Sequence, residues 1–425
     1  MKRFAGVRKG KVVIVSDVPI LTAGDVELLE VPRKFADVSS IELIRNFKVK
    51  NGKLINKLET KSAKELKIAF VGNWKMQCGI STYSESLWPL IDTMVGESRF
   101  FIEKNDSPTS ETNDERFIEC WTRGESLQEL VTKIKEYDPD IISIQHEFGL
   151  WPNARYWLSM MSQLSNYRVV VTMHSVFHHK DKTITEACMP EIVVHLRGAY
   201  EVLKDEKGIT SPVHVISHGY HPVDDTRRWI YYMSEQRSLP SSFGFRYKGF
   251  ETSIRAVALL KAKYPDVFFT AIFTESSHNA IEHETYYNEL VELIDSLDVK
   301  ENVSIVRGYQ SDQVLDSFIR TNKVVVLPYK SNPGHEVFGV SGAARYAMAK
   351  GVPVVTTSVN HFSDVPTVKA DTPESIAAEL DRLFSSDKVR EEQIRVQSNY
   401  IEENSWQHIA ERYVGLFVGK PTNHK

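Results

Sequence analysis

The stretch that decides the fold is LPYKSNPGHEVFGVSGAARYAMAKGVPVVTT, residues 327–357. The apolar run Val324–Leu327 leads into a polar loop, a helical segment rich in small residues follows at 342–350, and a second apolar run lies at Pro353–Thr357. This order predicts a buried strand, a loop, a helix and a second strand of a parallel sheet.

The beginning of the predicted helix is a candidate anion site. Gly339, Ser341 and Gly342 stand where the helix starts, and the first N–H groups of a helix have no partner within it. The helix dipole is also positive at this end, so a phosphate fits there. Arg345 lies one turn further on, where it can reach that phosphate or form a pair on the helix surface.

Composition points to a cytoplasmic protein of two globular domains plus an extension. The chain has 425 residues, of which 42% are hydrophobic. No run approaches the roughly 18 apolar residues of a membrane span, and the first ten residues lack the apolar stretch of a signal peptide. The three cysteines, Cys78, Cys120 and Cys188, form neither a disulfide framework nor a zinc ligand set. We therefore expect no metal and no cofactor.

Charge is distributed unevenly along the chain. The formal net charge is −4, which argues against a protein whose whole surface is basic and binds nucleic acid. The first 66 residues hold 14 Lys or Arg and 8 Asp or Glu, a net +6, and the rest of the chain carries the balance of −10. Such a basic segment is usually a solvated face. It also leaves open docking of an anionic acceptor and peripheral contact with a membrane.

The chain divides into a basic extension and two series of alternating strands and helices. AsnGly at 51–52 predicts a hairpin turn within the extension. From Lys67, apolar strands alternate with helical patterns, which predicts a parallel sheet covered on both faces. The expected strands of this first series are 67–72, 100–102, 117–120, 140–145, 168–172 and 213–217, and helices are expected near 126–136, 153–164 and 185–204.

The second series follows a polar, Arg-rich connection at 220–242 that lacks clear strand character. Expected helices are 249–264, 280–297 and 311–320, and expected strands are 267–273, 303–306 and 324–327. We therefore predict an α/β protein with two Rossmann-like, doubly wound lobes and a ligand cleft between them. The predicted divisions are an extension at 1–66, a first lobe at 67–222, a linker at 223–242, a second lobe at 243–402 and a C-terminal helix at 403–425.

Polar residues follow three strands of the first series. Gly79 stands at the start of the first helix, where backbone amides can approach a diphosphate, although it could equally be a packing glycine. Gln145, His146 and Glu147 leave the sheet at the end of the fourth strand, and capping or loop hydrogen bonds are the alternative role for His146 and Glu147. His174 follows the fifth strand and can hydrogen-bond a hydroxyl or be a structural histidine.

Two cations begin the second series. Arg246 and Lys248 precede a helix that starts near Gly249. A fixed cation in a dry site stabilises a leaving phosphate more strongly than water does. The alternative is an exposed pair at a helix start.

These motifs together resemble a known family. SGAARYA at 341–347, QHEFG at 145–149, MHSVFHH at 173–179 and KG at 248–249 are similar to motifs of the retaining GT-B glycosyltransferases of family 4, also called glycosyl transferases group 1. The resemblance runs from about Lys67 to Phe417. It implies transfer of a sugar from a nucleoside diphosphate to a hydroxyl with retained anomeric configuration and without a metal. It also implies that the last helix crosses back onto the first lobe.

The resemblance also implies roles for single residues. Glu336 would hold the sugar, Gly339, Val340 and Ser341 would offer backbone donors, and Lys248 would hold the diphosphate. His174 would lie beside the reacting sugar, and residues 145–147 would line the acceptor side. The sequence departs from the family at two positions: Tyr346 stands where a second glutamate binds the ribose, and Phe243 stands where an arginine is common. Arg246 is the candidate substitute for that arginine.

The acceptor and alternative functions remain open at this point. A glycan or lipid-linked saccharide is the commonest acceptor of the family. Because the N-terminal extension is basic, a modified base in DNA is an alternative acceptor. The two departures also leave open a non-catalytic protein that only binds nucleotide sugars. A GT-B epimerase or a phosphorylase would need acid–base carboxylates or a Schiff-base lysine, and we find no signature of either.

Overall fold

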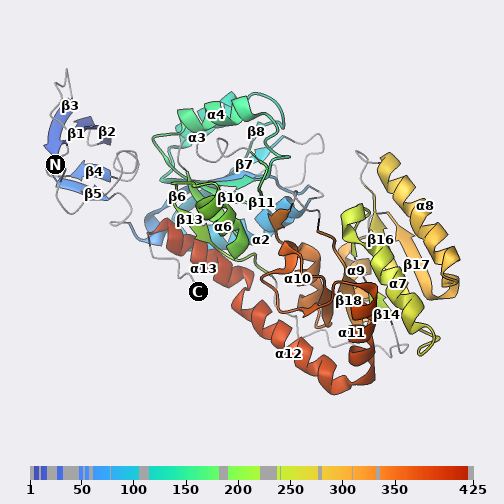
Figure 1. The fold of residues 1–425 in the computed structure, drawn as a ribbon. Coiled ribbons are helices and arrows are strands. Elements are labelled where there is room, and N and C mark those ends of the chain that lie inside the picture. Colours follow the sequence, from blue (N-terminus) through green and yellow to red (C-terminus); the bar gives the residue numbers. More distant parts are fainter. Residues whose placement is uncertain are drawn as a thin grey trace. The chain divides into compact units, whose positions relative to one another are not determined.

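The computed structural model describes residues 4–8, 11–16, 26–31, 47–50, 53–56, 61–76, 78–104, 114–180, 190–220, 237–239, 241–275, 280–308, 310–331 and 336–419 (Figure 1). The chain forms two compact units. The first unit comprises Met1–Val176, Lys180–Ser217 and Gln407–Lys425, and the second comprises Phe177–His179 and His218–Trp406.

The N-terminal extension forms an antiparallel sheet in the order β3-β1-β2-β4-β5. Its last two strands pair so that Lys50 faces Lys53. The AsnGly turn predicted at 51–52 lies outside the described residues. Ala5, Val12 and Val31 are buried together in a small core. The strands are β1 (Phe4–Arg8), β2 (Lys11–Ser16), β3 (Val26–Glu30), β4 (Phe47–Lys50) and β5 (Lys53–Asn56).

The main sheet of the first unit is parallel and doubly wound. Its order is β13-β12-β10-β9-β6-β7-β8, so the chain builds outward from β6 in one direction and then, from β9, in the other. The strands are β6 (Lys67–Gly72), β7 (Glu97–Glu103), β8 (Phe117–Trp121), β9 (Ile141–His146), β10 (Arg168–Met173), β12 (Glu191–Val194) and β13 (Val213–Val215).

Helices cover both faces of this sheet, α3 and α4 on one and α2 and α13 on the other (Figure 1). The C-terminal helix α13 is fixed to the sheet by polar contacts as well as packing: Tyr413 Oη lies 2.9 Å from both Tyr83 Oη and Thr172 Oγ1. The helices are α2 (Gly79–Met94), α3 (Gln128–Tyr137), α4 (Ala154–Gln163), α6 (Arg197–Glu201), which continues as a π-turn at Val202–Glu206, and α13 (Trp406–Phe417).

One prediction in the first unit is wrong. Residues 185–204 were expected to form one helix, but Glu191–Val194 is strand β12, which pairs with both β10 and β13. Three of its four residues are fully apolar and buried. A strand buried on both faces is a continuous apolar run, and periodicity cannot distinguish it from a buried turn of helix.

The second unit also contains a parallel doubly wound sheet. β14 and β15 follow each other along one side of β16, β17 pairs with its other side, and β18, β20 and β21 continue beyond β14. The strands are β14 (Arg237–Leu239), β15 (Ser241–Phe243), β16 (Phe268–Thr274), β17 (Val303–Arg307), β18 (Val324–Leu327), β20 (Val354–Thr356) and β21 (Val368–Lys369), and β19 (Val337–Gly339) lies outside this sheet. A further short strand, β11 (Ser175–Phe177), spans the boundary between the residues of the two units.

Each face of this sheet has its own core, because alternate residues of a strand point to opposite faces. Val324 and Val326 of β18 pack in one core with α7, α8 and α11, and Val325 and Leu327 pack in the other with α9, α10 and α12. The helices are α7 (Phe250–Leu260), α8 (Ala280–Ser296), α9 (Asp312–Arg320), α10 (Gly342–Ala349), α11 (Pro373–Ser385) and α12 (Asp387–Glu403), and 3-10 turns lie at Ala63–Glu65, Arg246–Lys248, Lys300–Asn302 and Asn360–Phe362.

A second correction concerns the segment expected to connect the lobes without strands. β14 lies within the predicted linker 223–242, and its position is central, between β16 and β18. Its sequence, ArgSerLeu, has little strand propensity. The ladder of backbone hydrogen bonds on both sides therefore outweighs the preference of the residues. None of the helices in the described part of the chain has both the length and the hydropathy of a membrane-spanning segment.

Candidate functional site

The second unit brings the predicted donor residues to the point where its strand order reverses. β15 ends at Phe243 and β18 ends at Leu327, and the chain builds outward in opposite directions from these two strands. Ligands of doubly wound sheets bind outside the carboxyl ends of the strands at such a reversal. The turn that carries Lys248 follows β15, and the loop that carries Tyr329 follows β18.

Backbone contacts hold that turn and that loop together. The Lys330 N–H donates to the Tyr247 carbonyl at 2.7 Å. Gly249 has φ 69°, and a Cβ atom there would overlap the carbonyl oxygen of Pro328. Only glycine accommodates both the positive φ and this close approach. The position of Lys248, one residue earlier, is therefore fixed relative to the loop.

The Lys248 ammonium lies against aromatic rings. Its Nζ is 3.8 Å from the centroid of Tyr329 and 4.8 Å from that of Tyr247. No described carboxylate pairs with it, whereas the neighbouring Lys330 pairs with Glu251. Burial lowers the pKa of Lys248 below the ordinary lysine value. A hydrogen bond to the Tyr247 side chain partly offsets this effect of burial. A partly desolvated cation that pairs with no described carboxylate is well suited to an anionic ligand.

The N-terminus of α10 lies at the hydroxyl of Tyr329. Ser341 is the N-cap, and its Oγ accepts from the Ala344 N–H at 3.4 Å. The Tyr329 hydroxyl lies 3.4 Å from the same Oγ. Gly339 is buried and Val340 is half-buried just before the cap. The expected backbone donors therefore do precede a helix, as the sequence predicted.

Arg345 lies inside the second unit. Its guanidinium is 2% exposed, donates to the Tyr220 hydroxyl at 2.9 Å and to the Ser341 carbonyl at 3.1 Å, and pairs with Asp364. The alternative of a pair on the helix surface is therefore wrong, and direct contact with a phosphate stays a prediction. No sequence pattern indicated this burial, since two of the three partners, Asp364 and Tyr220, are 19 and 125 residues away.

Three other predicted positions have different surroundings. Arg246 is exposed, pairs with Glu289 and lies over the Tyr286 ring. Glu336 is half-buried immediately before β19. Tyr346, at the position of the family's second glutamate, donates its hydroxyl to Asp316, which also accepts from Lys350 at 2.9 Å. A contact from Tyr346 to a ribose would require this pair to open.

The first unit has a second cluster at its own reversal of strand order, between β6 and β9. Gln145 near the end of β9 is fully buried, and a Cβ at Gly72, the last residue of β6, would lie 3.1 Å from its Cγ. The Gln145 Oε1 lies 3.0 Å from His174 Nε2. Tyr83 packs its edge on the His174 ring at a centroid distance of 4.7 Å. The sequence analysis named Gln145 and His174 as candidates but predicted neither their contact nor the place of Tyr83.

The neighbours of this pair are less accessible. His146 is 1% exposed between Phe148 and Trp157, and burial lowers its pKa to about 4, so it is neutral at physiological pH. This packing favours the structural alternative for His146. Burial raises the pKa of Glu147, whose Oε1 accepts from the Phe148 N–H. Gly79 is the exposed first residue of α2.

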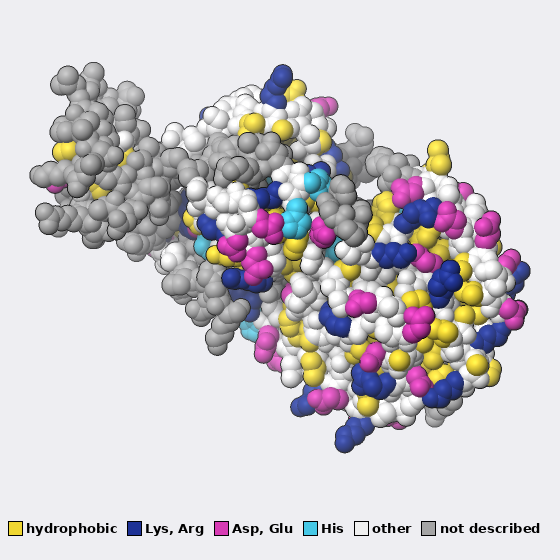
Figure 2. Space-filling view, viewed as in Figure 1, with side chains coloured by type: hydrophobic (Ala, Val, Ile, Leu, Met, Phe, Trp, Pro, Cys, Tyr) yellow, Lys and Arg dark blue, Asp and Glu magenta, His cyan; other side chains and the backbone are white. Residues whose placement is uncertain are grey.

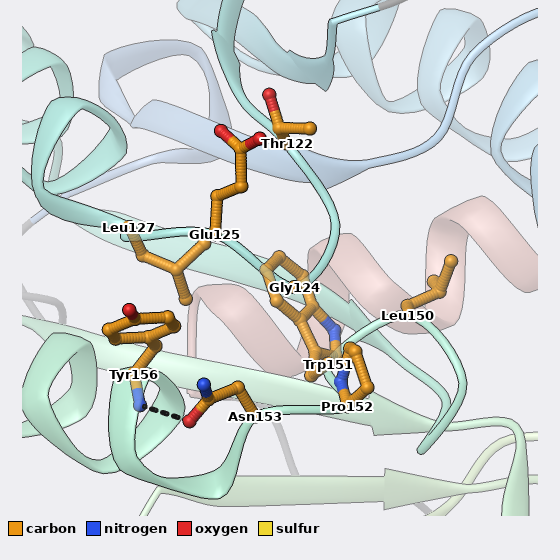
Figure 3. Close-up of a pocket in the computed structure, with 9 residues that line it drawn as sticks. All are labelled: Thr122, Gly124, Glu125, Leu127, Leu150, Trp151, Pro152, Asn153 and Tyr156. Carbon is orange, nitrogen blue, oxygen red and sulfur yellow. Dashed lines mark hydrogen bonds between the residues drawn. The ribbon is translucent and has the colours of Figure 1, made fainter.

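A shallow pocket lies elsewhere in the first unit, between the loops that follow β8 and β9 (Figure 3). Asn153 caps α4 there by accepting from the Tyr156 N–H. None of the predicted site residues lines it. The lining residues are Thr122, Gly124, Glu125, Leu127, Leu150, Trp151, Pro152, Asn153 and Tyr156.

The charged surface gives no sign of a polyanion-binding face on the second unit as drawn in Figure 2, where positive and negative side chains intermingle. Arg307, for example, pairs with Glu275 and Glu284. Within the described parts of the chain, no three His, Cys, Asp or Glu side chains are grouped to hold a metal ion.

Comparisons with known proteins agree with this architecture. Residues 241–398, most of the second unit, match the family model described as glycosyl transferases group 1. No curated protein matches the chain. The structure is similar to a glycosyltransferase from Rickettsia africae ESF-5 (TM-score 0.67, 13% identity, 84% of this chain and 100% of that one). It is also similar to Anabaena Alr3699/HepE in complex with UDP (TM-score 0.62, 13% identity, 83% and 99%).

A third similar structure is described as trehalose-6-phosphate from E. coli bound with UDP-2-fluoro glucose (TM-score 0.64, 12% identity, 84% of this chain and 100% of that one). At this identity the likeness shows the fold alone. The fold is GT-B, with two Rossmann-like lobes, as the sequence predicted.

Proposed function

We propose that the protein is a retaining glycosyltransferase that moves a sugar from a nucleoside diphosphate sugar to an acceptor hydroxyl. The observation that carries the proposal is the cation and helix N-terminus at the strand reversal of the second unit. Lys248 lies over the Tyr329 ring and the Ser341 cap contacts the Tyr329 hydroxyl, all within the segment that matches glycosyl transferases group 1.

The second unit supplies what a leaving diphosphate needs. As the bond from the anomeric carbon to the phosphate oxygen breaks, negative charge grows on that oxygen. The Lys248 ammonium and the N–H groups of α10 are fixed before this happens, so they stabilise the charge without reorganising. Glu336 would accept hydrogen bonds from sugar hydroxyls. Retention follows if the acceptor oxygen attacks on the face that the phosphate leaves and gives its proton to that phosphate.

The first unit supplies a polar group of fixed geometry. Gln145 orients the His174 ring, which would hydrogen-bond a hydroxyl of the transferred sugar. Glu147 would contact the acceptor, for which we propose a glycan or glycolipid. Similar proteins of known structure are described with UDP and a UDP-sugar analogue, so UDP-sugars are the first donors to test. We propose that the reaction needs no metal.

The test is a panel of nucleoside diphosphate sugars, in which thermal stabilisation and slow donor hydrolysis are measured with and without EDTA. A true donor should stabilise the wild type and be hydrolysed equally in EDTA. Lys248→Met should lose both effects. Lys263→Met is the matched control, because Lys263 also lies over a tyrosine ring in the same unit but pairs with Asp381.

The proposal fails if no nucleotide sugar stabilises the protein. Stabilisation without hydrolysis or transfer would instead indicate a non-catalytic nucleotide-sugar-binding protein. A modified base in DNA as acceptor would be indicated by retention of DNA that weakens steeply with added salt.

A further inference from the structure

We propose that Tyr329 is a positioning residue for anion binding, which holds the Lys248 ammonium on its ring face and contacts the Ser341 cap with its hydroxyl. The Lys248 ammonium and the N-terminus of α10 would then bind the same phosphate or diphosphate group. This inference rests on the proposed role of Lys248 and Ser341, and it names a residue to which the sequence motifs assign no function.

The first support is the contact of ring and cation. At 3.8 Å from the ring centroid, Lys248 Nζ is well within the roughly 6 Å over which a ring face attracts a cation. Tyr329 is 2% exposed, so little water competes. Since no described carboxylate pairs with Lys248, its ammonium can donate to an incoming anion without first breaking an ion pair.

The second support is the rigidity of the ring. The Tyr329 carbonyl accepts from Thr357 Oγ1 at 2.6 Å, and the next residue, Lys330, bonds the Tyr247 backbone. Phe362 and His361 pack against the ring, with centroids 4.7 and 5.7 Å away. Backbone and ring are thus both fixed, and a fixed ring restricts where the flexible lysine can place its charge.

The third support is the hydroxyl. Tyr329 Oη lies 3.4 Å from Ser341 Oγ, which caps the helix that carries the proposed backbone donors. One side chain therefore contacts both halves of the proposed anion site. An aromatic residue that only filled the core would not need a lysine on one side and a helix cap on the other.

The test uses the full chain and measures binding of inorganic pyrophosphate and of UDP by calorimetry. Tyr329→Leu removes the ring and should weaken pyrophosphate binding about tenfold. Tyr329→Phe keeps the ring face and should stay within about threefold of the wild type. In a Lys248→Met background, Tyr329→Leu should cause no further loss. Thermal unfolding of each variant confirms that it folds.

A matched control is Tyr264→Leu, because Tyr264 packs against Lys263, whose charge is paired with Asp381. This variant should bind pyrophosphate like the wild type. The inference is overturned if the wild type does not bind pyrophosphate, if Tyr329→Leu binds it normally, or if Phe is as harmful as Leu. The inference is also overturned if Tyr329→Leu weakens pyrophosphate binding equally with Lys248 present and in the Lys248→Met background. If Lys248→Met leaves no measurable binding, the comparison of Tyr329→Phe with Tyr329→Leu tests the inference.

The same experiment separates this inference from the proposed function. Tyr329-dependent binding of pyrophosphate without binding of any nucleotide sugar would leave the inference standing and reject the function. Donor hydrolysis that is unaffected by Tyr329→Leu would support the proposed function and reject the inference about Tyr329.

Discussion

At the scale of single residues, Lys248 and Lys330 show two ways to accommodate a lysine in neighbouring segments. Lys330 neutralises Glu251 on the surface, whereas Lys248 lies on two tyrosine rings and has a lowered pKa because of burial. The sequence indicated Lys248 through its place before a glycine at a helix start. It could not indicate Tyr329, because nothing in ProTyrLys says which ring face a lysine 81 positions earlier will cover.

The lowered pKa of Lys248 predicts a pH dependence. A lysine binds a diphosphate as its ammonium, so affinity should fall as pH rises through a pKa below the ordinary 10.5. Lys248→Arg stays charged and should bind with little change over the same range. Calorimetric titration of UDP from pH 7 to pH 10 measures both. An equally steep decline in the arginine variant would assign the titration to another group.

Alanine substitutions at Gly249 and Gly351 can separate the strain of a positive φ from the steric overlap of an added Cβ. Gly249→Ala would have to adopt φ 69° and would overlap Pro328, whereas Gly351, with φ 72°, has open space around it. Each alanine should suffer the strain of a left-handed backbone, of order 1 kcal/mol. Gly249→Ala should lose about 2 kcal/mol more and also weaken binding at Lys248. Denaturant unfolding of both variants gives the difference, and equal losses would contradict the close approach.

At the scale of secondary structure, the sequence predicted the elements whose own pattern determines them. The two strands and the helix of the block at 324–357 form as predicted, because the apolar runs and the small residues of the helix agree with each other. The predicted loop between them also contains strand β19, and residues 332–335 lie outside the described residues. Two elements differ from the prediction, because β12 lies in a predicted helix and β14 in the predicted linker. The first is an apolar run too short to show a period, and the second is a strand because its neighbours supply hydrogen bonds on both sides.

Helix α13 depends on a polar anchor that no local pattern reveals. Arg168 at the start of β10 donates to the carbonyls of Leu416 and Phe417 at 3.0 and 2.7 Å and pairs with Glu191. Arg168→Met should cost about 3–5 kcal/mol, because it leaves Glu191 and two carbonyls without this partner. Arg197→Met removes an exposed ion pair with Glu201 in the same unit, and it should lower the unfolding free energy by less than ~0.5 kcal/mol. Denaturant unfolding and amide exchange in α13 measure the effect.

The same anchor predicts a loss of stability in acid. Burial opposes the charge on Glu191, but hydrogen bonds from His214 and Arg168 prevail and lower its pKa to about 2. A carboxylate with a lowered folded-state pKa stabilises the fold above its unfolded pKa, near 4.5, and this contribution is lost as pH falls toward about 2. The stability difference between wild type and Arg168→Met should therefore shrink between pH 5 and pH 2. A constant difference would show that packing alone accounts for the loss.

At the scale of the whole molecule, the alternation of strands and helices was sufficient to predict two doubly wound lobes, because parallel strands need crossover helices. The alternation could not predict which strand is central in each sheet. The central strand depends on which strand edges pair, and its position determines where the strand order reverses. In the first unit, Gln145 lies near the end of β9 and contacts His174, which follows the neighbouring strand β10. In the second unit, Lys248 and Tyr329 follow the strands β15 and β18, and Tyr329 contacts both Lys248 and Ser341.

This separation of the candidate residues predicts how a nucleoside diphosphate stabilises the protein. Lys248, Tyr329, Glu336 and Ser341 all belong to the second unit. A ligand at one hundred times its Kd adds about 2.7 kcal/mol to the unfolding free energy of what it binds. Saturating UDP should therefore slow amide exchange in 246–249, 328–331 and 339–345, and leave exchange in the sheet of the first unit little changed. Lys248→Met should abolish the protection. Protection that appears first in the β6 and β9 strands would instead place the diphosphate in the first unit and contradict the assignment of the donor site.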